Sequence, residues 1–277
     1  VYTNAQIMGW MLDEYEKKVG HHEPGVITGK PIELGGIALR SDSTAHGGFI
    51  IFEEVVEKLG LHKSKLTIAI QGFGNAGANM MKYLDANDYK VVAVSDSKGG
   101  IYNGSGLTYS EVEKIKSEKG SVSFVSISTS SSLSSSITNE ELLELDVDVL
   151  VLAALENQIT AKNAGNIKSK YIIELANGPV TAEADNILFS KDVVVIPDIL
   201  ANSGGVVVSY FEWAQNRTGN ILDEKYLEDK LVKMMTDAWN KVSNLVDEHK
   251  GKIDYRTAAY IIAINRILSA EKHRGNL

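Results

Sequence analysis

The sequence contains no cysteine and no long apolar run, and it has fewer basic than acidic residues. With zero cysteines among 277 residues, disulfide bonds, a thiolate nucleophile and a cysteine-ligated metal are excluded. No stretch of about eighteen consecutive apolar residues is present, so we expect no membrane-spanning helix. No signal peptide is recognisable either. We therefore expect a cytoplasmic protein that has no membrane partner.

Acidic residues outnumber basic ones by 36 to 28, which gives a formal net charge of −8. This balance disfavours a nucleic-acid groove or an anionic membrane surface as the main partner. Hydrophobic residues make up 44% of the chain, enough to bury a full core in one large domain or in a domain with a second lobe. His21 and His22 have no third ligand at a usable spacing, so we expect no metal site.

The most informative stretch is LTIAIQGFGNAG, residues 66–77. Its apolar first half predicts a strand, and apolar spacing over 79–85 predicts a helix. Between them Gly72 permits a tight turn, Gly74 lets the backbone approach a phosphate, and Gly77 lets the helix pack close to the strand. The helix N-terminus adds unpaired N–H groups and the positive end of the helix dipole. The pattern predicts a dinucleotide pyrophosphate site; the alternative is a strand–helix crossover without a ligand.

An acidic residue follows this motif at the spacing that a dinucleotide site uses. The apolar run 91–94 predicts the next strand, and it ends in Asp96, 24 residues after Gly72. A carboxylate there can accept hydrogen bonds from the adenosine ribose hydroxyls of NAD. Lys98 stands two residues further on and could instead pair with the 2′-phosphate of NADP. Both coenzymes stay open, as does a solvated aspartate without a ligand.

Strand and helix patterns alternate through the middle of the chain, which indicates an α/β fold with a doubly wound, Rossmann-like parallel sheet. Three further apolar, β-branched runs predict buried strands at 147–152, 171–175 and 193–196. Helices are expected at 160–167 and 181–188. Ligands of such sheets bind beyond the carboxyl ends of the strands. We expect five loops to meet at that edge: 72–77, 96–100, 153–157, 176–179 and 198–205.

Flanking segments complete the expected organisation. Thr3 or Asn4 can cap a first helix that runs to about residue 18, and residues 121–136 form a serine-rich tract expected to be a flexible surface loop with a weak strand at 122–127. The tract 96–106 is expected to be a turn-rich loop. Capping boxes open two expected short helices, one at 108–120 and one that starts at Thr138. The remaining expected helices cover 48–59, 203–216, 223–247 and 253–272. We divide the chain into a helical and loop segment at 1–60, a dinucleotide-binding domain at 61–220 and C-terminal helices at 221–277, which pack on that domain or on an N-terminal lobe.

Six motifs in register resemble one enzyme family over essentially the whole chain. They are GKPIELGG, IQGFGNAG, VVAVSDSKGGIYN, AALENQIT, ELANGP and ANSGGVVVSYFEW. Together they are similar to the glutamate dehydrogenases of the hexameric bacterial and archaeal type, within the glutamate/leucine/phenylalanine/valine dehydrogenases. The resemblance implies a Rossmann-type coenzyme domain and NAD- or NADP-linked oxidative deamination of L-glutamate to 2-oxoglutarate and ammonia. It also implies a homo-hexamer for the full-length family member.

The resemblance also implies roles for individual residues. The glycine turn would hold the pyrophosphate, Asp96 the adenosine ribose, and Thr44 the nicotinamide carboxamide. Ser209 would donate a hydrogen bond to the glutamate γ-carboxylate. The implied coenzyme-binding residues are Arg40, Thr44, Gly72, Phe73, Gly74, Asn75, Ala76, Gly77, Asp96, Ser97, Ala153, Ala154, Asn177 and Asn202, and the implied substrate-binding residues are Val206 and Ser209.

The chain departs from the family pattern in several respects, one of which is the serine-rich tract 121–136 in place of an ordinary loop. The family's glycine-rich segment with its catalytic lysine and the catalytic aspartate are not found, and we expect them N-terminal to Val1. His46 stands where arginine is expected, and Leu152 where proline is usual. We therefore expect this chain to bind coenzyme without oxidising glutamate by itself. The alternatives are a non-catalytic dinucleotide-binding module and a dehydrogenase of leucine, phenylalanine or valine; Ser209 disfavours the last, because an apolar side chain needs no hydroxyl partner.

Overall fold

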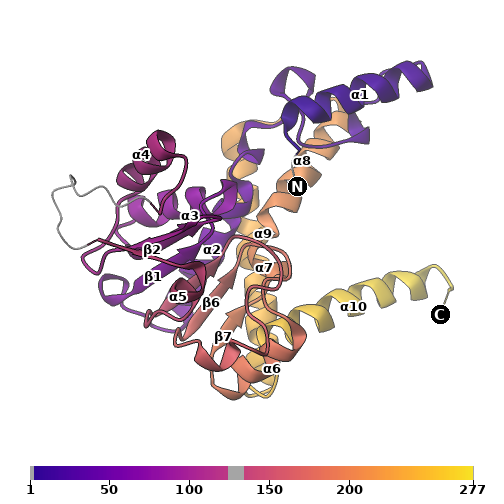
Figure 1. The fold of residues 1–277 in the computed structure, drawn as a ribbon. Helices are drawn as coiled ribbons and strands as arrows, with labels where there is room; N and C mark the ends of the chain where they lie inside the picture. Colours follow the sequence, from indigo (N-terminus) through magenta and orange to yellow (C-terminus); the bar gives the residue numbers. More distant parts are fainter. Residues whose placement is uncertain (1–2, 124–133, 277) are drawn as a thin grey trace.

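Seven strands form one mixed sheet at the centre of the computed structural model, which describes residues 3–123 and 134–276 (Figure 1). The strand order is β4-β3-β2-β1-β5-β6-β7. Strands β1, β2, β5, β6 and β7 run parallel, β3 pairs with β2 in the antiparallel direction, and β4 pairs with β3 in the antiparallel direction. The strands are β1 (Thr67–Gln71), β2 (Lys90–Asp96), β3 (Gly99–Tyr102), β4 (Ser135–Ile137), β5 (Val149–Leu152), β6 (Tyr171–Glu174) and β7 (Val194–Ile196). The expected doubly wound α/β sheet is confirmed.

The chain changes direction across the sheet beside β1. From β1 it continues outward on one side to β2, and it later returns on the other side to β5. At the carboxyl ends of these strands Gln71 pairs with both Ser95 and Leu152. The loops that follow β1 and β5 therefore leave the sheet next to each other, at the point where such sheets bind ligands.

Helices cover both faces of the sheet, and none in the described part of the chain is long and apolar enough to cross a membrane. The outer turns of α1 and α10 extend away from the sheet (Figure 1). The helices are α1 (Ala5–Val19), α2 (Ser43–Lys58), α3 (Asn75–Ala86), α4 (Tyr109–Lys119), α5 (Asn139–Leu143), α6 (Ala182–Ser190), α7 (Asp198–Ala201), α8 (Gly204–Thr218), α9 (Glu224–Glu248) and α10 (Tyr255–His273).

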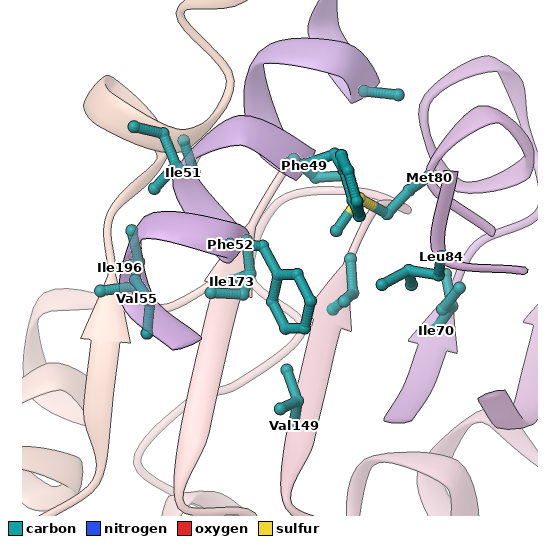
Figure 2. Close-up of a cluster of buried hydrophobic side chains, with 14 of the residues drawn as sticks. Phe49, Ile51, Phe52, Val55, Ile70, Met80, Leu84, Val149, Ile173 and Ile196 are labelled. Atoms are coloured by element: carbon teal, nitrogen blue, oxygen red, sulfur yellow. The ribbon is translucent and has the colours of Figure 1, made fainter. Parts of the chain in front are cut away.

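Successive side chains of each strand point to opposite faces of the sheet, which divides the core into two layers. In β1, Ile68 and Ile70 pack into the layer formed with α2, α3, α8 and α9, whereas Ala69 packs into the layer formed with α5 and α6. This follows from the two-residue period of a strand, which sends successive side chains to opposite faces. In the first layer Phe52 and Val55 of α2 lie over the strands (Figure 2).

Side-chain caps fix several helix starts as expected. Asn4 Oδ1 accepts from the backbone N–H of Ile7 at 3.0 Å at the start of α1. Both expected capping boxes form, with Thr108 opening α4 and Thr138 opening α5. Each satisfies two N–H groups that the helix itself leaves unpaired.

Several local expectations differ from the structure. The tract 96–106 is not only a loop, because β3 forms an antiparallel pair with β2. The expected helix at 160–167 is wrong: Asn163 bonds to the backbone of neighbouring residues, and only a short 3₁₀ turn at Ala164–Asn166 forms. Helix α2 begins before residue 48, since its polar, glycine-rich first turns are buried. The strand expected at 122–127 lies largely outside the described residues.

Candidate functional site

A cleft of about 560 Å³ lies at the carboxyl edge of the parallel strands. It brings together the loops after β5 and β6 with the first turns of α2, α3 and α8. The loop after β2 lines a separate cavity of about 370 Å³. The predicted residues that line the cleft are Arg40, Thr44, Ala76, Ala153, Ala154, Asn177, Asn202, Val206 and Ser209.

The glycine turn at the end of β1 has the geometry that its sequence predicts. Gly72 has φ +96°, and a Cβ there would lie 2.6 Å from the carbonyl oxygen of Ala153. A Cβ on Gly77 would overlap the carbonyl oxygen of Gly72, so α3 packs directly on the turn. Gly74, by contrast, has open space where a Cβ would stand, and no described side chain caps the helix that it opens. The unpaired N–H groups of α3 therefore remain available to an anion.

The residues within the turn point in different directions. Phe73 is only 5% exposed and packs in the core near the ring of Tyr109, so only its backbone could meet a ligand. Asn75 is exposed, donates to the Ser41 carbonyl at 2.9 Å and lines a second cavity, which it shares with Arg40. The turn therefore offers backbone groups and small side chains rather than charge.

Asp96 does not line the cleft, and its carboxylate is already bonded within the protein. It accepts from Lys116 Nζ at 2.5 Å, and from Ser121 Oγ and the backbone N–H groups of Lys98 and Val122 at 2.9 Å each. Burial alone would raise the pKa of Asp96, but these donors, Lys116 foremost, outweigh it and hold the pKa below its ordinary value. A ribose hydroxyl could bond to Asp96 only by replacing or sharing one of these donors.

Ser97 is exposed and lines the separate cavity near α5, beside Lys98 and Asn139. Asn139 connects this region to the end of β2, because its side-chain amide donates to the Asp96 carbonyl at 2.9 Å and accepts from Ser95 at 2.7 Å. The structure thus places Asp96 and Ser97 together, apart from the other predicted residues.

A cation and a hydroxyl meet on one side of the cleft. Arg40 ends a 3₁₀ turn at Ala38–Arg40, and its Nε donates to Ser209 Oγ of α8 at 2.9 Å. Ser209 in turn donates to the carbonyl oxygen of Gly205 at 3.0 Å. Arg40 forms no ion pair with any carboxylate in the described part of the chain. Its positive charge is therefore left for whatever occupies the cleft.

Two helices approach closely beside this pair. A Cβ on Gly47 of α2 would lie 2.7 Å from the Cα of Gly204 in α8. A Cβ on Gly205 would lie 2.6 Å from Thr44 Oγ1. The close contact brings Thr44 and the first turn of α8 together at the cleft.

Amide groups line the part of the cleft beyond β6. Asn202, which follows α7, donates to Asn177 Oδ1 at 2.7 Å and to the carbonyl oxygen of Leu175 at 3.3 Å. The loop after β5 contributes the small side chains of Ala153 and Ala154. A ligand here meets neutral hydrogen-bonding groups and little bulk.

Sequence reasoning did not single out every residue that lines the cleft. The additional ones are Leu155, Glu156, Leu175, Ala176 and Gly205. Apart from Leu175, all of them fall inside loops that were expected to meet at this edge. The expectation that five loops meet in one place is wrong for the loop 96–100, which lines the separate cavity.

Comparison with known proteins gives consistent matches over nearly the whole chain. The Glutamate/Leucine/Phenylalanine/Valine dehydrogenase family model matches residues 35–275. The cryptic catabolic NAD-specific glutamate dehydrogenase of Bacillus subtilis is 42% identical over 99% of this chain, and an NADP-specific glutamate dehydrogenase of Synechocystis is 44% identical over 99%. The hetero-hexameric glutamate dehydrogenase of Thermus thermophilus superimposes with a TM-score of 0.89 at 29% identity, over 99% of this chain and 63% of that one.

The chain spans 62% and 64% of the length of the two curated relatives. Residues 35–275, which the family model matches, include the glycine turn, the Arg40–Ser209 pair and the amides after β6. On this evidence the chain belongs to the Glutamate/Leucine/Phenylalanine/Valine dehydrogenase family.

Proposed function

We propose that the chain binds NAD or NADP and forms part of a protein that oxidatively deaminates L-glutamate to 2-oxoglutarate and ammonia. One observation carries the proposal: a single cleft joins Ala76, in the uncapped first turn of α3, to Arg40 and its partner Ser209. Arg40 has no ion-pair partner among the described residues. The names of the relatives support both coenzymes, since one is NAD-specific and another NADP-specific.

The residues present fit a dinucleotide. The open space at Gly74 and the free N–H groups of α3 suit a pyrophosphate, which needs close backbone approach and a positive helix end. Ala153 and Ala154 leave room for an extended ligand, and Asn177 and Asn202 offer amides to a ribose or carboxamide. A bound nicotinamide would accept the hydride from the amino-acid Cα. We also propose that the chain is divided into a helical and loop segment at 1–60, a coenzyme domain at 61–220 and C-terminal helices at 221–277.

Arg40 and Ser209 favour an acidic amino acid over an apolar one. A guanidinium and a hydroxyl in contact can both bond to a carboxylate, and the charge of Arg40 is free to do so. Val206 is 67% exposed at the same place and supplies apolar contact for methylene groups. A leucine, phenylalanine or valine side chain would leave the positive charge of Arg40 without a carboxylate partner.

We assign no catalytic acid or base to this chain. Glu156 is the only carboxylic acid among the residues that line the cleft, it is exposed, and no lysine lines the cleft. We therefore propose that other parts of the whole protein supply proton transfer and that this chain alone does not oxidise glutamate. Because the Thermus relative is a hetero-hexamer, we further propose that the whole protein assembles as a hexamer, of identical subunits in this case.

Coenzyme binding tests the proposal directly. The fluorescence of NADH should change when NADH is titrated with the wild-type chain. Gly74→Asp should weaken NADH binding more than tenfold, because it places an anion where the pyrophosphate would lie and open space accommodates it.

Gly165→Asp is the matched control. Gly165 also has open space where a Cβ would stand, its φ is not positive, and it does not line the cleft. Its NADH affinity should equal that of the wild type. A wild-type chain that binds neither NADH nor NADPH, or equal loss in both variants, would refute the proposed coenzyme site.

A further inference from the structure

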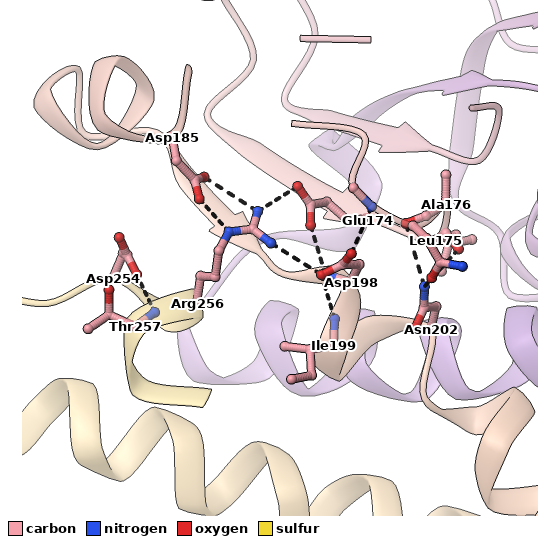
Figure 3. A network of polar contacts seen from close by, with 12 residues as sticks. Glu174, Leu175, Ala176, Asp185, Asp198, Ile199, Asn202, Asp254, Arg256 and Thr257 are labelled. Atoms are coloured by element: carbon pink, nitrogen blue, oxygen red, sulfur yellow. Dashed lines mark hydrogen bonds and ion pairs between the residues drawn. The ribbon is translucent and has the colours of Figure 1, made fainter. Parts of the chain in front are cut away.

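The start of α10 carries an arginine that holds three structural elements together (Figure 3). Arg256 Nη2 donates to Glu174 Oε1 of β6 at 2.7 Å, and Nη1 donates to Asp198 Oδ1 of α7 at 3.2 Å. Nε and Nη2 donate to the two oxygens of Asp185 in α6. Only the planar fork of arginine offers donors in enough directions to bond to all three carboxylates at once.

Two of these carboxylates also accept hydrogen bonds from backbone N–H groups. Glu174 uses its second oxygen to accept from the N–H of Asp198 at 2.7 Å. Asp198 uses its second oxygen to accept from the N–H of Gly178 at 2.8 Å. Arg256 therefore fixes the loop after β6 through Asp198, although none of its hydrogen bonds in the described structure reaches that loop directly. Asp185 makes no bond to the loop after β6 in the described structure.

The segment fixed in this way lines the cleft. The loop that contains Gly178 begins with Leu175 and Asn177, both of which line the cleft. Asn202 at the end of α7 donates to Leu175 and Asn177, so α7 and the loop form one hydrogen-bonded unit. Asp198 is the first residue of α7 and accepts a hydrogen bond from Gly178 of the loop after β6. Arg256 bonds to this unit through Asp198.

We propose that Arg256 is a positioning residue for the coenzyme: through Asp198 it sets the placement of the Asn177–Asn202 pair in the cleft. The inference rests on the proposed function, because it assumes that the amide pair faces the nicotinamide half of a dinucleotide. The competing explanation is that Arg256 only attaches α10 to the sheet. That role would affect stability without changing how the cleft binds a ligand.

Three variants separate these explanations. Arg256→Lys keeps the positive charge but cannot bond to all three carboxylates. Asp198→Asn keeps one acceptor oxygen, which cannot serve both Arg256 and Gly178 in their present positions. Asp185→Asn is the control, because Asp185 contacts the same guanidinium and has no bond to the loop. Asp198→Asn keeps the test decisive if Arg256→Lys fails to fold.

The measurement is the affinity of each variant for NADH and for ADP, which lacks the nicotinamide half. Arg256→Lys and Asp198→Asn should weaken NADH binding about tenfold and leave ADP binding unchanged. Asp185→Asn should change neither affinity by more than about twofold. Unchanged NADH affinity in the first two variants, or equal losses for NADH and ADP, would overturn the inference. A wild-type chain that binds neither ligand would instead overturn the proposed function.

Discussion

Lys30 and Glu212 form a buried pair of one positive and one negative charge, whereas Arg256 faces three carboxylates. Both side chains of the pair are 0% exposed, and Lys30 Nζ donates to Glu212 Oε1 and to the Ile27 carbonyl, each at 2.6 Å. Glu212 also accepts from the backbone N–H groups of Gly29 and Lys30. The pair ties the loop before α2 to α8 with its charges balanced.

The arginine cluster has a surplus of negative charge. Burial raises the pKa of Glu174 to about 7, although its bonds from Arg256 and from the N–H of Asp198 lower it. Burial also raises the pKa of Asp185, against the effect of Arg256. One guanidinium cannot compensate three carboxylates fully, so the cluster can take up a proton near neutral pH. A balanced pair therefore depends on both partners, whereas an unbalanced cluster tolerates the loss of one negative charge.

The largest effect is expected from breaking the balanced pair. Glu212→Gln keeps an acceptor for the backbone but leaves the Lys30 ammonium buried without a counter-charge. We expect it to lower the free energy of unfolding by about 3 kcal/mol, measured by urea denaturation.

The matched control removes both charges. Lys30→Met combined with Glu212→Gln should recover most of that loss, because a neutral pair no longer requires compensation. If the double variant is as unstable as the single one, the cost arises from packing rather than from the unpaired charge.

The second effect is a pH dependence that Glu174 gives to stability. Between pH 4.5 and about 7 its carboxyl is protonated in the folded state and ionised in the unfolded state, so this contribution favours folding at low pH and is lost as the pH rises to 7. Glu174→Gln lacks it. The stability of the variant relative to the wild type should therefore rise by about 2 kcal/mol between pH 5 and pH 7.

Urea denaturation of both proteins at the two pH values measures this difference, and the contributions that the two proteins share cancel in it. A constant difference would mean that Arg256 keeps Glu174 ionised throughout, and the cluster would then behave like the balanced pair.

The smallest effect is expected from Asp185→Asn. It removes one of the surplus negative charges and leaves Arg256 paired with Glu174 and Asp198. We expect the free energy of unfolding to change by less than about 1 kcal/mol, well below the effect of Glu212→Gln. A loss as large as that of Glu212→Gln would show that the cluster has no charge to spare.

The sequence predicts the parallel strands well because each is a short apolar, β-branched run. It fails where the local pattern is weak: β3 begins with Gly99 and Gly100, which resemble a turn, and its pairing with β2 is a tertiary contact. It fails again at 160–167, where Asn163 bonds to the backbone around it and stops helix formation.

For the site, most of the loops were predictable because strand polarity fixes the edge at which they meet, but the loop 96–100 lines a separate cavity instead of the cleft. The partners of individual side chains were not. Asp96 is read from the sequence as a ribose acceptor, but Lys116 and Ser121 occupy its oxygens, and nothing local in the sequence indicates this. Arg256 lies 82 residues from Glu174, a separation that no spacing rule covers.

The meeting of α2 and α8 at Gly47 and Gly204 has a consequence for selectivity. The backbones of the two helices are in direct contact there, so no side chain can change rotamer to alter the distance between the helices. Thr44 and Val206 project from this fixed frame into the cleft. A substitution at either position would then change the side chains that line the cleft while the distance between α2 and α8 stays the same. Under this condition one scaffold can accept amino acids of different polarity.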